Sequence, residues 1–219
     1  MIEGYAIIRE AAHEAADAAK TAVEGLREGR IQGEEPFTDR MIGAIEQRMN
    51  GLQTKGIRWS ALTLTAHQRG AQETTFGADF MGVLHINLPD FRVQKGFLAQ
   101  AKLLEPNAYF SPNESRRLAE QCRRMLAHSP DSFVFLYSRY SIRVVPAISV
   151  VGLHQPMSPY ALYRRSIARF FEEHFESFIG DSRMSGPNVE SLKALQEQVG
   201  TRLVLFLKGG IDGVPQEND

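Results

Sequence analysis

Apolar residues recur every three or four positions in five segments, and this spacing predicts five amphipathic helices. The first, over 3–30, is rich in alanine, and its apolar stripe needs a partner surface. After a break at 32–36, Thr38 is the predicted N-cap of a second helix that ends near Asn50. The remaining helices are predicted over 114–128, 156–179 and 189–199.

Other segments alternate apolar and polar residues, or are continuously apolar, which is typical of strands. The turn residues at 87–90 predict that the second and third strands form an antiparallel hairpin. The helix over 114–128 lies before an apolar strand, as a crossover connection requires. Strands are predicted over 57–65, 80–88, 96–104, 133–137, 142–151 and 202–207.

Helices before, between and after these strands predict an α/β fold, a three-layer sandwich with a central mixed sheet flanked by helices. A length of 219 residues with 43% hydrophobic residues suits one domain. Within it we expect a helical extension over 1–35, a core over 36–150, C-terminal helices and an edge strand over 151–208, and a tail over 209–219.

The apolar runs are too short for a membrane protein, because a membrane helix needs roughly 20 apolar residues. The longest run, 144–153, has ten and contains a proline. The single cysteine, Cys122, cannot form an internal disulfide, and the N-terminus has no secretory signal pattern. We therefore expect a cytoplasmic protein without a membrane segment.

Charge is unevenly distributed along the chain, although the formal net charge is only −1. Residues 51–150 hold 12 basic and 7 acidic side chains, whereas both flanking parts are acidic. Of the 25 basic residues, 19 are arginine, whose planar guanidinium matches a phosphate group. The basic centre favours a polyanionic partner, although such an excess is also common on solvated surfaces.

Two polar residues interrupt the apolar strand predicted over 96–104. Gln100 and Lys102 are two positions apart, so their side chains leave the strand on the same face. Asp79 lies at the start of the neighbouring strand and can reach the same region. Buried polar groups without partners are costly, so a metal and phosphate site would explain this arrangement. A structural interpretation has Asp79 capping a turn, Gln100 hydrogen-bonded in the core and Lys102 extending from a sheet edge.

The ordered motif Gly77-Ala78-Asp79 followed by Gln100-Ala101-Lys102 resembles the PD-(D/E)xK nuclease superfamily, in particular its Mrr-type and antiviral effector nucleases. The resemblance covers roughly residues 36–150. It implies a restriction-endonuclease-like fold and Mg²⁺-dependent hydrolysis of DNA, with Mn²⁺ as a possible substitute. In it Asp79 binds the metal, Gln100 completes the metal shell and Lys102 steadies the attacking water or the developing phosphate charge. A proline before the aspartate, found in the family, is missing here.

Oxygen ligands of this kind suit Mg²⁺, and the main-chain carbonyl of Ala101 can serve beside Asp79 and Gln100. A glutamine in place of a second acid leaves the metal shell one charge short. Glu73 or Glu46 could supply the missing carboxylate, and the sequence leaves both open.

The helix over 114–128 carries residues that could contact a DNA backbone: Arg116, Arg117, Gln121, Arg123 and Arg124. A solvated helix face explains these arginines equally well. The aromatic residues over 157–179 fit a core, or an interface in a homodimer that cuts both strands. So short a chain also implies a regulatory or sensor partner.

The sequence thus predicts a metal-dependent DNA endonuclease, such as a bacterial or phage defence effector. The alternative is a catalytically inactive module of the same fold that binds nucleic acid or a partner protein. The chain has no Gly-x-x-x-x-Gly-Lys-Ser/Thr motif, which argues against nucleotide hydrolysis through a P-loop.

Overall fold

The protein is described here by a computed structural model, which covers residues 2–66, 77–153 and 158–211. One mixed sheet of eight strands runs through these residues in the order β1-β2-β8-β3-β4-β5-β6-β7. The strands are β1 (Gln53–Thr54), β2 (Ile57–Thr65), β3 (Phe80–Leu88), β4 (Phe91–Leu103), β5 (Ser132–Tyr137), β6 (Ile142–Pro146), β7 (Arg165–Ser166) and β8 (Leu203–Ile211).

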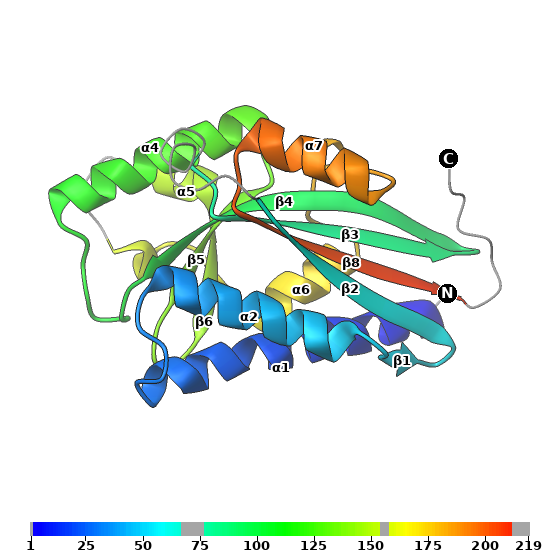
Figure 1. Ribbon diagram of the computed structural model, residues 1–219. Helices are drawn as coiled ribbons and strands as arrows, with labels where there is room; N and C mark the ends of the chain where they lie inside the picture. Colours follow the sequence, from blue (N-terminus) through cyan, green and yellow to red (C-terminus); the bar gives the residue numbers. More distant parts are fainter. Residues whose placement is uncertain (1, 67–76, 154–157, 212–219) are drawn as a thin grey trace.

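Helices cover both faces of this sheet, which gives the three layers expected of an α/β sandwich (Figure 1). One face carries α1 (Ile2–Arg27), α2 (Glu34–Met49) and α6 (Ile167–Phe175). The other carries α4 (Pro112–His128), α5 (Ala147–Val151) and α7 (Val189–Val199). Two short 3₁₀ turns, η1 (Pro159–Ala161) and η2 (Ser182–Met184), complete the elements. None of the described helices has the length and apolarity needed to cross a membrane.

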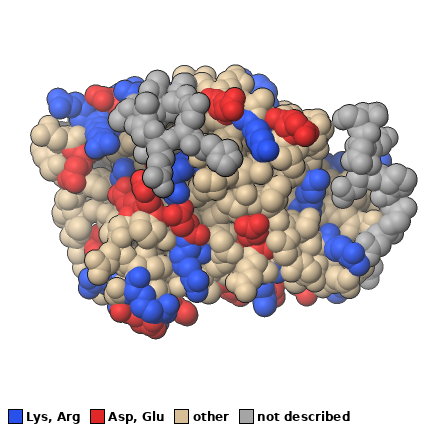
Figure 2. Space-filling view, in the orientation of Figure 1, with Lys and Arg blue, Asp and Glu red and all other residues tan. Residues whose placement is uncertain are grey.

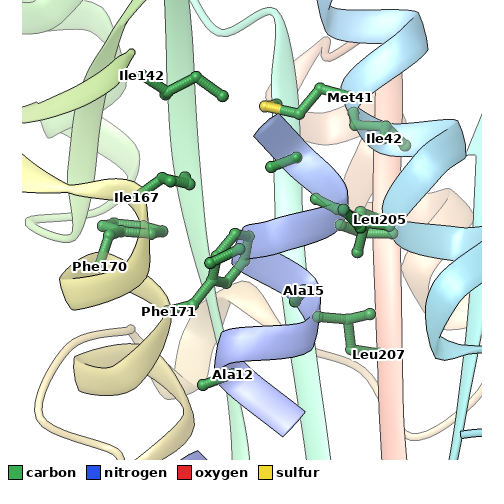
Figure 3. Packing of buried hydrophobic residues seen from close by; sticks show 14 of the residues in the cluster. Ala12, Ala15, Met41, Ile42, Ile142, Ile167, Phe170, Phe171, Leu205 and Leu207 are labelled. Carbon is green, nitrogen blue, oxygen red and sulfur yellow. The ribbon is translucent and has the colours of Figure 1, made fainter. Parts of the chain in front are cut away.

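The alanine stripe of α1 finds its partner surface inside the protein. Ala12 and Ala15 are fully buried, and their small side chains let α1 pack closely against its neighbours in the helical layer, α2 and α6. Figure 3 shows Ala12 and Ala15 beside Phe171 of α6 and the β8 residues Leu205 and Leu207. The expected extension is therefore part of the main core. The aromatic residues of α6 also pack in this core, as one of the two sequence interpretations holds.

Several predicted elements are confirmed. β2, β3 and α7 have the predicted bounds, and β3 and β4 form an antiparallel hairpin closed at Pro89 and Asp90. β4 and β5 are parallel neighbours, and the chain between them contains α4, so the predicted crossover is present.

The prediction of an edge strand near the C-terminus was wrong. β8 lies between β2 and β3, in the interior of the sheet, antiparallel to the first and parallel to the second. It also extends through Ile211, so the predicted tail begins later than position 209. The continuous apolar run of 203–207 fits a strand buried on both faces.

Two prolines explain errors in the predicted bounds. Pro36 lies in the first turn of α2, where no main-chain N–H is needed, so the helix begins at Glu34 and Thr38 is buried inside it rather than capping it. Pro146 ends β6 because it cannot donate to a strand neighbour, and Ala147–Val151 is helical instead of extended.

The prediction of one long helix over 156–179 was also wrong. Over the described residues, this region forms η1, the short strand β7 and then α6. The strand occurs because Arg165 and Ser166 pair with β6 at the edge of the sheet, a tertiary contact that the helical spacing of aromatic residues does not reveal.

Candidate active site

The candidate site lies where β4 extends past the start of β3. β3 pairs with β4 only from Phe80, which faces Ala99, so among the described residues β4 has a single strand neighbour beyond that point. The main-chain N–H of Ala101 donates to Asp79 Oδ2 at 2.7 Å, and that of Leu103 donates to Glu34 Oε1 at 3.0 Å. At these two positions of β4, a side-chain carboxylate accepts the main-chain N–H that a neighbouring strand would otherwise accept.

The three residues of the predicted motif line one small cavity here, of about 170 Å³. Asp79 precedes β3, whereas Gln100 and Lys102 lie on β4. The lining residues are Glu34, Glu35, Thr38, Asp79, Gln100, Lys102, Arg117, Gln121 and Arg202. The structure thus brings together the motif residues, the start of α2 and one face of α4.

Gln100 is the most deeply buried polar group of the motif, with 2% of the residue exposed. Its Nε2 donates to Asp79 Oδ2 and to the Ala101 carbonyl, the latter at 3.2 Å. Among the residues that the structure describes, the buried Oε1 of Gln100 has no hydrogen-bond partner. A buried acceptor without a donor costs about 1–3 kcal/mol, so this oxygen suits a bound cation or water.

Lys102 is held by a carboxylate that the sequence analysis missed. Its ammonium lies 3.0 Å from Glu34 Oε2, and the side chain of Lys102 is 18% exposed. Glu34 is the first residue of α2 and lies beside Glu35, where the helix dipole favours negative charge. Acidic side chains gather over the start of α2 in Figure 2. The pair Glu34-Glu35 was the available signal, but residues 32–36 were interpreted as a break between helices.

Gly77 explains how Asp79 comes to lie against α4. Its φ of +86° favours glycine, and a Cβ atom at this position would lie 2.5 Å from the Gln121 carbonyl oxygen. The chain before β3 therefore contacts α4 directly. Gln121 lines the cavity, and its buried Oε1 also lacks a hydrogen-bond partner in the described part of the chain.

Only one of the four predicted α4 arginines lines the cavity. Arg117 does so because it lies one helical turn before Gln121 and shares its face. Arg116, Arg123 and Arg124 are exposed on α4 and are not among the lining residues. Arg116 donates to Asn113 on its own helix at 3.3 Å.

Arg202 is a second lining residue that sequence reasoning did not find. It precedes β8, and its guanidinium lies 2.7 Å from Asp39 Oδ1 on α2. Because β8 is inserted between β2 and β3, residue 202 reaches the cavity from the far end of the chain. No local sequence signal could have indicated this approach.

Of the two residues considered for an additional carboxylate, Glu46 and Glu73, the structure describes only Glu46. Glu46 accepts a hydrogen bond from Thr63 Oγ1 at 2.5 Å and is not among the residues that line the cavity. Glu73 lies outside the described residues. Among the acids that the structure describes, Glu34 and Glu35 line the cavity together with Asp79.

Cys122, next to Gln121 on α4, is a core residue. It is fully buried, and burial raises the pKa of its thiol to about 12, so the thiol stays protonated at neutral pH. The predicted structural role of this cysteine agrees with its environment.

The donor atoms of the cavity are those that a hard cation prefers. Asp79, the free carboxamide oxygen of Gln100 and the Ala101 carbonyl are oxygen donors, and Glu34 adds a second carboxylate nearby. Within the described ranges, no three His, Cys, Asp or Glu side chains are grouped as a metal site. Oxygen donors of this kind, with water completing the shell, are those that Mg²⁺ prefers.

The chain matches no protein-family model, no curated protein and no solved structure. The geometry of the cavity is therefore the basis of a functional assignment.

Proposed function

We propose that this protein is a metal-dependent DNA endonuclease with a restriction-endonuclease-like arrangement of its site. The observation that carries the proposal is the convergence of Asp79, Gln100 and Lys102 on one cavity, where no described residue donates a hydrogen bond to the buried Gln100 Oε1. These residues come from two segments about twenty positions apart, and the motif resemblance had assigned them one shared site.

The proposed cofactor is Mg²⁺, with Mn²⁺ as a substitute. Asp79, Gln100 and the Ala101 carbonyl would hold it, and when bound it would polarise the scissile phosphate and lower the pKa of a water. The hydrogen bonds from Gln100 Nε2 and the Ala101 N–H orient the Asp79 carboxylate and fix where its oxygens lie.

Lys102 is suited to stabilise negative charge on the phosphate. Its ion pair with Glu34 holds the ammonium in place. Arg117 and Arg202 add two further cations to the cavity wall, against the three carboxylates of Asp79, Glu34 and Glu35. The lining is thus close to neutral, so binding a divalent cation together with a phosphodiester leaves little uncompensated charge.

In this proposal the substrate is DNA and the biological role is restriction or defence in a bacterium or phage. A second copy of the chain, or a regulatory sensor protein, would be the partner. The exposed Arg116, Arg123 and Arg124 would then contact the DNA backbone outside the cavity.

The test is cleavage of supercoiled plasmid with Mg²⁺, Mn²⁺ or EDTA by the parent protein, Asp79→Ala and Lys102→Ala, each checked for folding by circular dichroism. Lys20→Ala is the matched control, because it removes an exposed lysine that pairs with Asp17 on α1. We expect metal-dependent cutting by the parent and Lys20→Ala, and a loss of at least about 100-fold in the other two variants.

The second candidate is a DNA-binding module without catalysis. It is favoured by one observation, that the described residues hold no group of three metal-binding side chains. Salt-sensitive DNA binding by the parent without cutting in either metal would support this module and overturn the nuclease. Equal cutting by the parent and Lys102→Ala would refute the proposed site.

A further inference from the structure

Three tyrosines are strongly exposed near the end of β4 that carries the cavity. Tyr109, Tyr140 and Tyr163 are 75%, 79% and 67% exposed. They belong to three different segments: the loop after β4, the turn between β5 and β6, and the stretch between η1 and β7. With Leu103 they make up half of the large hydrophobic side chains exposed in the described part of the chain.

Hydrogen bonds join these three segments into one surface, here called the tyrosine edge and defined by Tyr109, Tyr140 and Tyr163. Each bond has one partner within a few positions of an exposed tyrosine. The bonds are Ser158 Oγ to the Ala108 carbonyl (3.4 Å), the Arg139 N–H to Glu105 Oε1 (3.2 Å) and Tyr160 Oη to the Leu104 carbonyl (2.9 Å). The three rings are thus presented by loops that hold one another in place.

The tyrosine edge adjoins the cavity. Leu103 follows Lys102 directly, and its N–H donates to Glu34, while Leu104 holds Tyr160. In Figure 1 the loop after β4, the β5–β6 connection and the first turn of α2 lie at the same end of the molecule. A strand whose phosphate occupied the cavity would therefore continue onto this surface.

The edge is basic as well as aromatic. Arg139 and Arg164 are exposed beside Tyr140 and Tyr163, and Arg143 is partly exposed on β6. Arg165 lies 5.2 Å from the centre of the Tyr163 ring, so a cation covers one of the rings. Two acids lie nearby: Glu105 accepts the Arg139 main-chain N–H, and Glu173 forms an ion pair with Arg165.

Exposed aromatic rings with neighbouring arginines are the means by which proteins hold unpaired bases. Every base has a flat face that stacks on an aromatic ring, and the arginines pair with the phosphates. In a duplex these faces are covered by the neighbouring bases, so exposed tyrosines gain nothing from it. We propose that the tyrosine edge binds single-stranded DNA next to the cavity, and that the substrate is an unpaired strand. The identity of the substrate rests on the proposed function, whereas the binding surface does not.

The test measures binding of a fluorescein-labelled oligothymidylate of about 15 nucleotides by anisotropy, in EDTA so that no cutting occurs. We expect Tyr109→Ala, Tyr140→Ala and Tyr163→Ala each to weaken binding about tenfold, and Tyr140→Phe to retain it because the ring remains. Phe178→Ala is the matched control, because this side chain is also strongly exposed, at 73%. It follows Ser177, whose carbonyl accepts from Lys95 in the first half of β4, whereas the tyrosine edge lies beyond the end of that strand.

Competition with the same sequence as a duplex completes the experiment. Single-stranded DNA binding at least about tenfold tighter than duplex binding, and lost with the tyrosines, supports the proposal. It is overturned if the duplex binds equally well, if the alanine variants bind like the parent, or if no oligonucleotide binds, which would assign the edge to a protein partner. Binding that depends on the tyrosines, without metal-dependent cutting, would refute only the proposed nuclease activity. Metal-dependent cutting by the parent, with tyrosine variants that bind the oligonucleotide like the parent, would refute only the proposed role of the tyrosine edge.

Discussion

At the scale of single residues, the cavity shows how one side chain can serve two purposes. Asp79 and Glu34 each accept a main-chain N–H of β4 that has no strand partner, and each also contacts a polar side chain of the motif. A main-chain N–H at the end of a strand needs an acceptor, and these two carboxylates provide one. The same hydrogen bonds orient the two carboxylates in the cavity.

Glu34 provides a test of which acid assists Lys102. Glu34→Gln keeps an oxygen for the Leu103 N–H but removes the charge that pairs with Lys102, so we expect the rate of plasmid cutting to fall at least about tenfold. Glu46→Gln should cost less, because Glu46 bonds to Thr63 instead. The measurement is the initial rate with Mg²⁺ at matched folding. A larger loss in Glu46→Gln than in Glu34→Gln would assign the additional acid to Glu46.

A buried histidine makes the stability of the protein depend on pH. His174 is fully buried beside Phe97 and Phe170, and burial lowers its pKa to about 4. In the unfolded chain its pKa is near 6.5, so below this pH protons bind preferentially to the unfolded state. The contribution of His174 to stability is present above about pH 6.5 and is lost as the pH falls towards 4.

We therefore expect the free energy of unfolding to fall between about pH 6.5 and about pH 5, by up to about 1.4 kcal/mol per pH unit for this group. His85, whose pKa burial also lowers to about 4, adds to the trend. Urea unfolding at several pH values measures the slope. His174→Phe should reduce the slope, and a variant with the slope of the parent would show that other groups are responsible.

At the scale of elements, the contact between Gly77 and α4 fixes the site. α4 starts at a capping box in which Ser111 and Glu114 bond reciprocally, and these bonds lower the pKa of the Glu114 carboxyl. The helix then passes so close to Gly77 that a side chain there has no room. The capping box fixes the start of α4, and the contact of α4 with Gly77 then determines where Asp79 lies just before β3.

Gly77→Ala tests this contact. The new methyl group would meet the Gln121 carbonyl and would also strain the positive φ, so we expect a loss of about 2–4 kcal/mol in stability. Gly56→Ala is the control, since its φ of +91° is similar but no atom lies within 4 Å of the added Cβ; about 1 kcal/mol is expected. Thermal and urea denaturation give both values. Equal losses in the two variants would mean that the chain before β3 moves away from α4 without cost.

At the scale of the whole molecule, β8 joins two parts of the sheet that are otherwise separate. β1 and β2 precede β3 in the sequence but contact it in the sheet only through β8. Residues 203–207 are all buried, and they belong to both cores. The fold cannot be completed until the C-terminal part of the chain is inserted.

Truncation tests this dependence. A chain that ends at Arg202 loses the pairing of β8 with both β2 and β3, so we expect no cooperative unfolding transition. A chain that ends at Ile211 keeps every β8 pair and should retain a cooperative transition. Calorimetry distinguishes the two, and a cooperative transition in the shorter chain would show that β2 and β3 associate without β8.

Local patterns were sufficient where neighbours in the sequence are neighbours in space. Period and turn chemistry account for the alternating residues of β2, the turn at Pro89 and Asp90, the crossover through α4 and the spacing of Gln100 and Lys102 on one strand face. The amino-acid sequence by itself therefore determined the α/β class, the hairpin and a polar motif in the middle of an apolar strand.

The tertiary structure alone decided which distant groups share the cavity. Glu34 and Arg202 enter it from opposite ends of the chain, because β8 inserts between β2 and β3 and α2 starts beside the end of β4. Periodicity reports which face of an element is buried, but not which element covers it. That choice depends on long-range packing, and this is why the partner of Lys102 and the interior place of the last strand were visible only in the folded molecule.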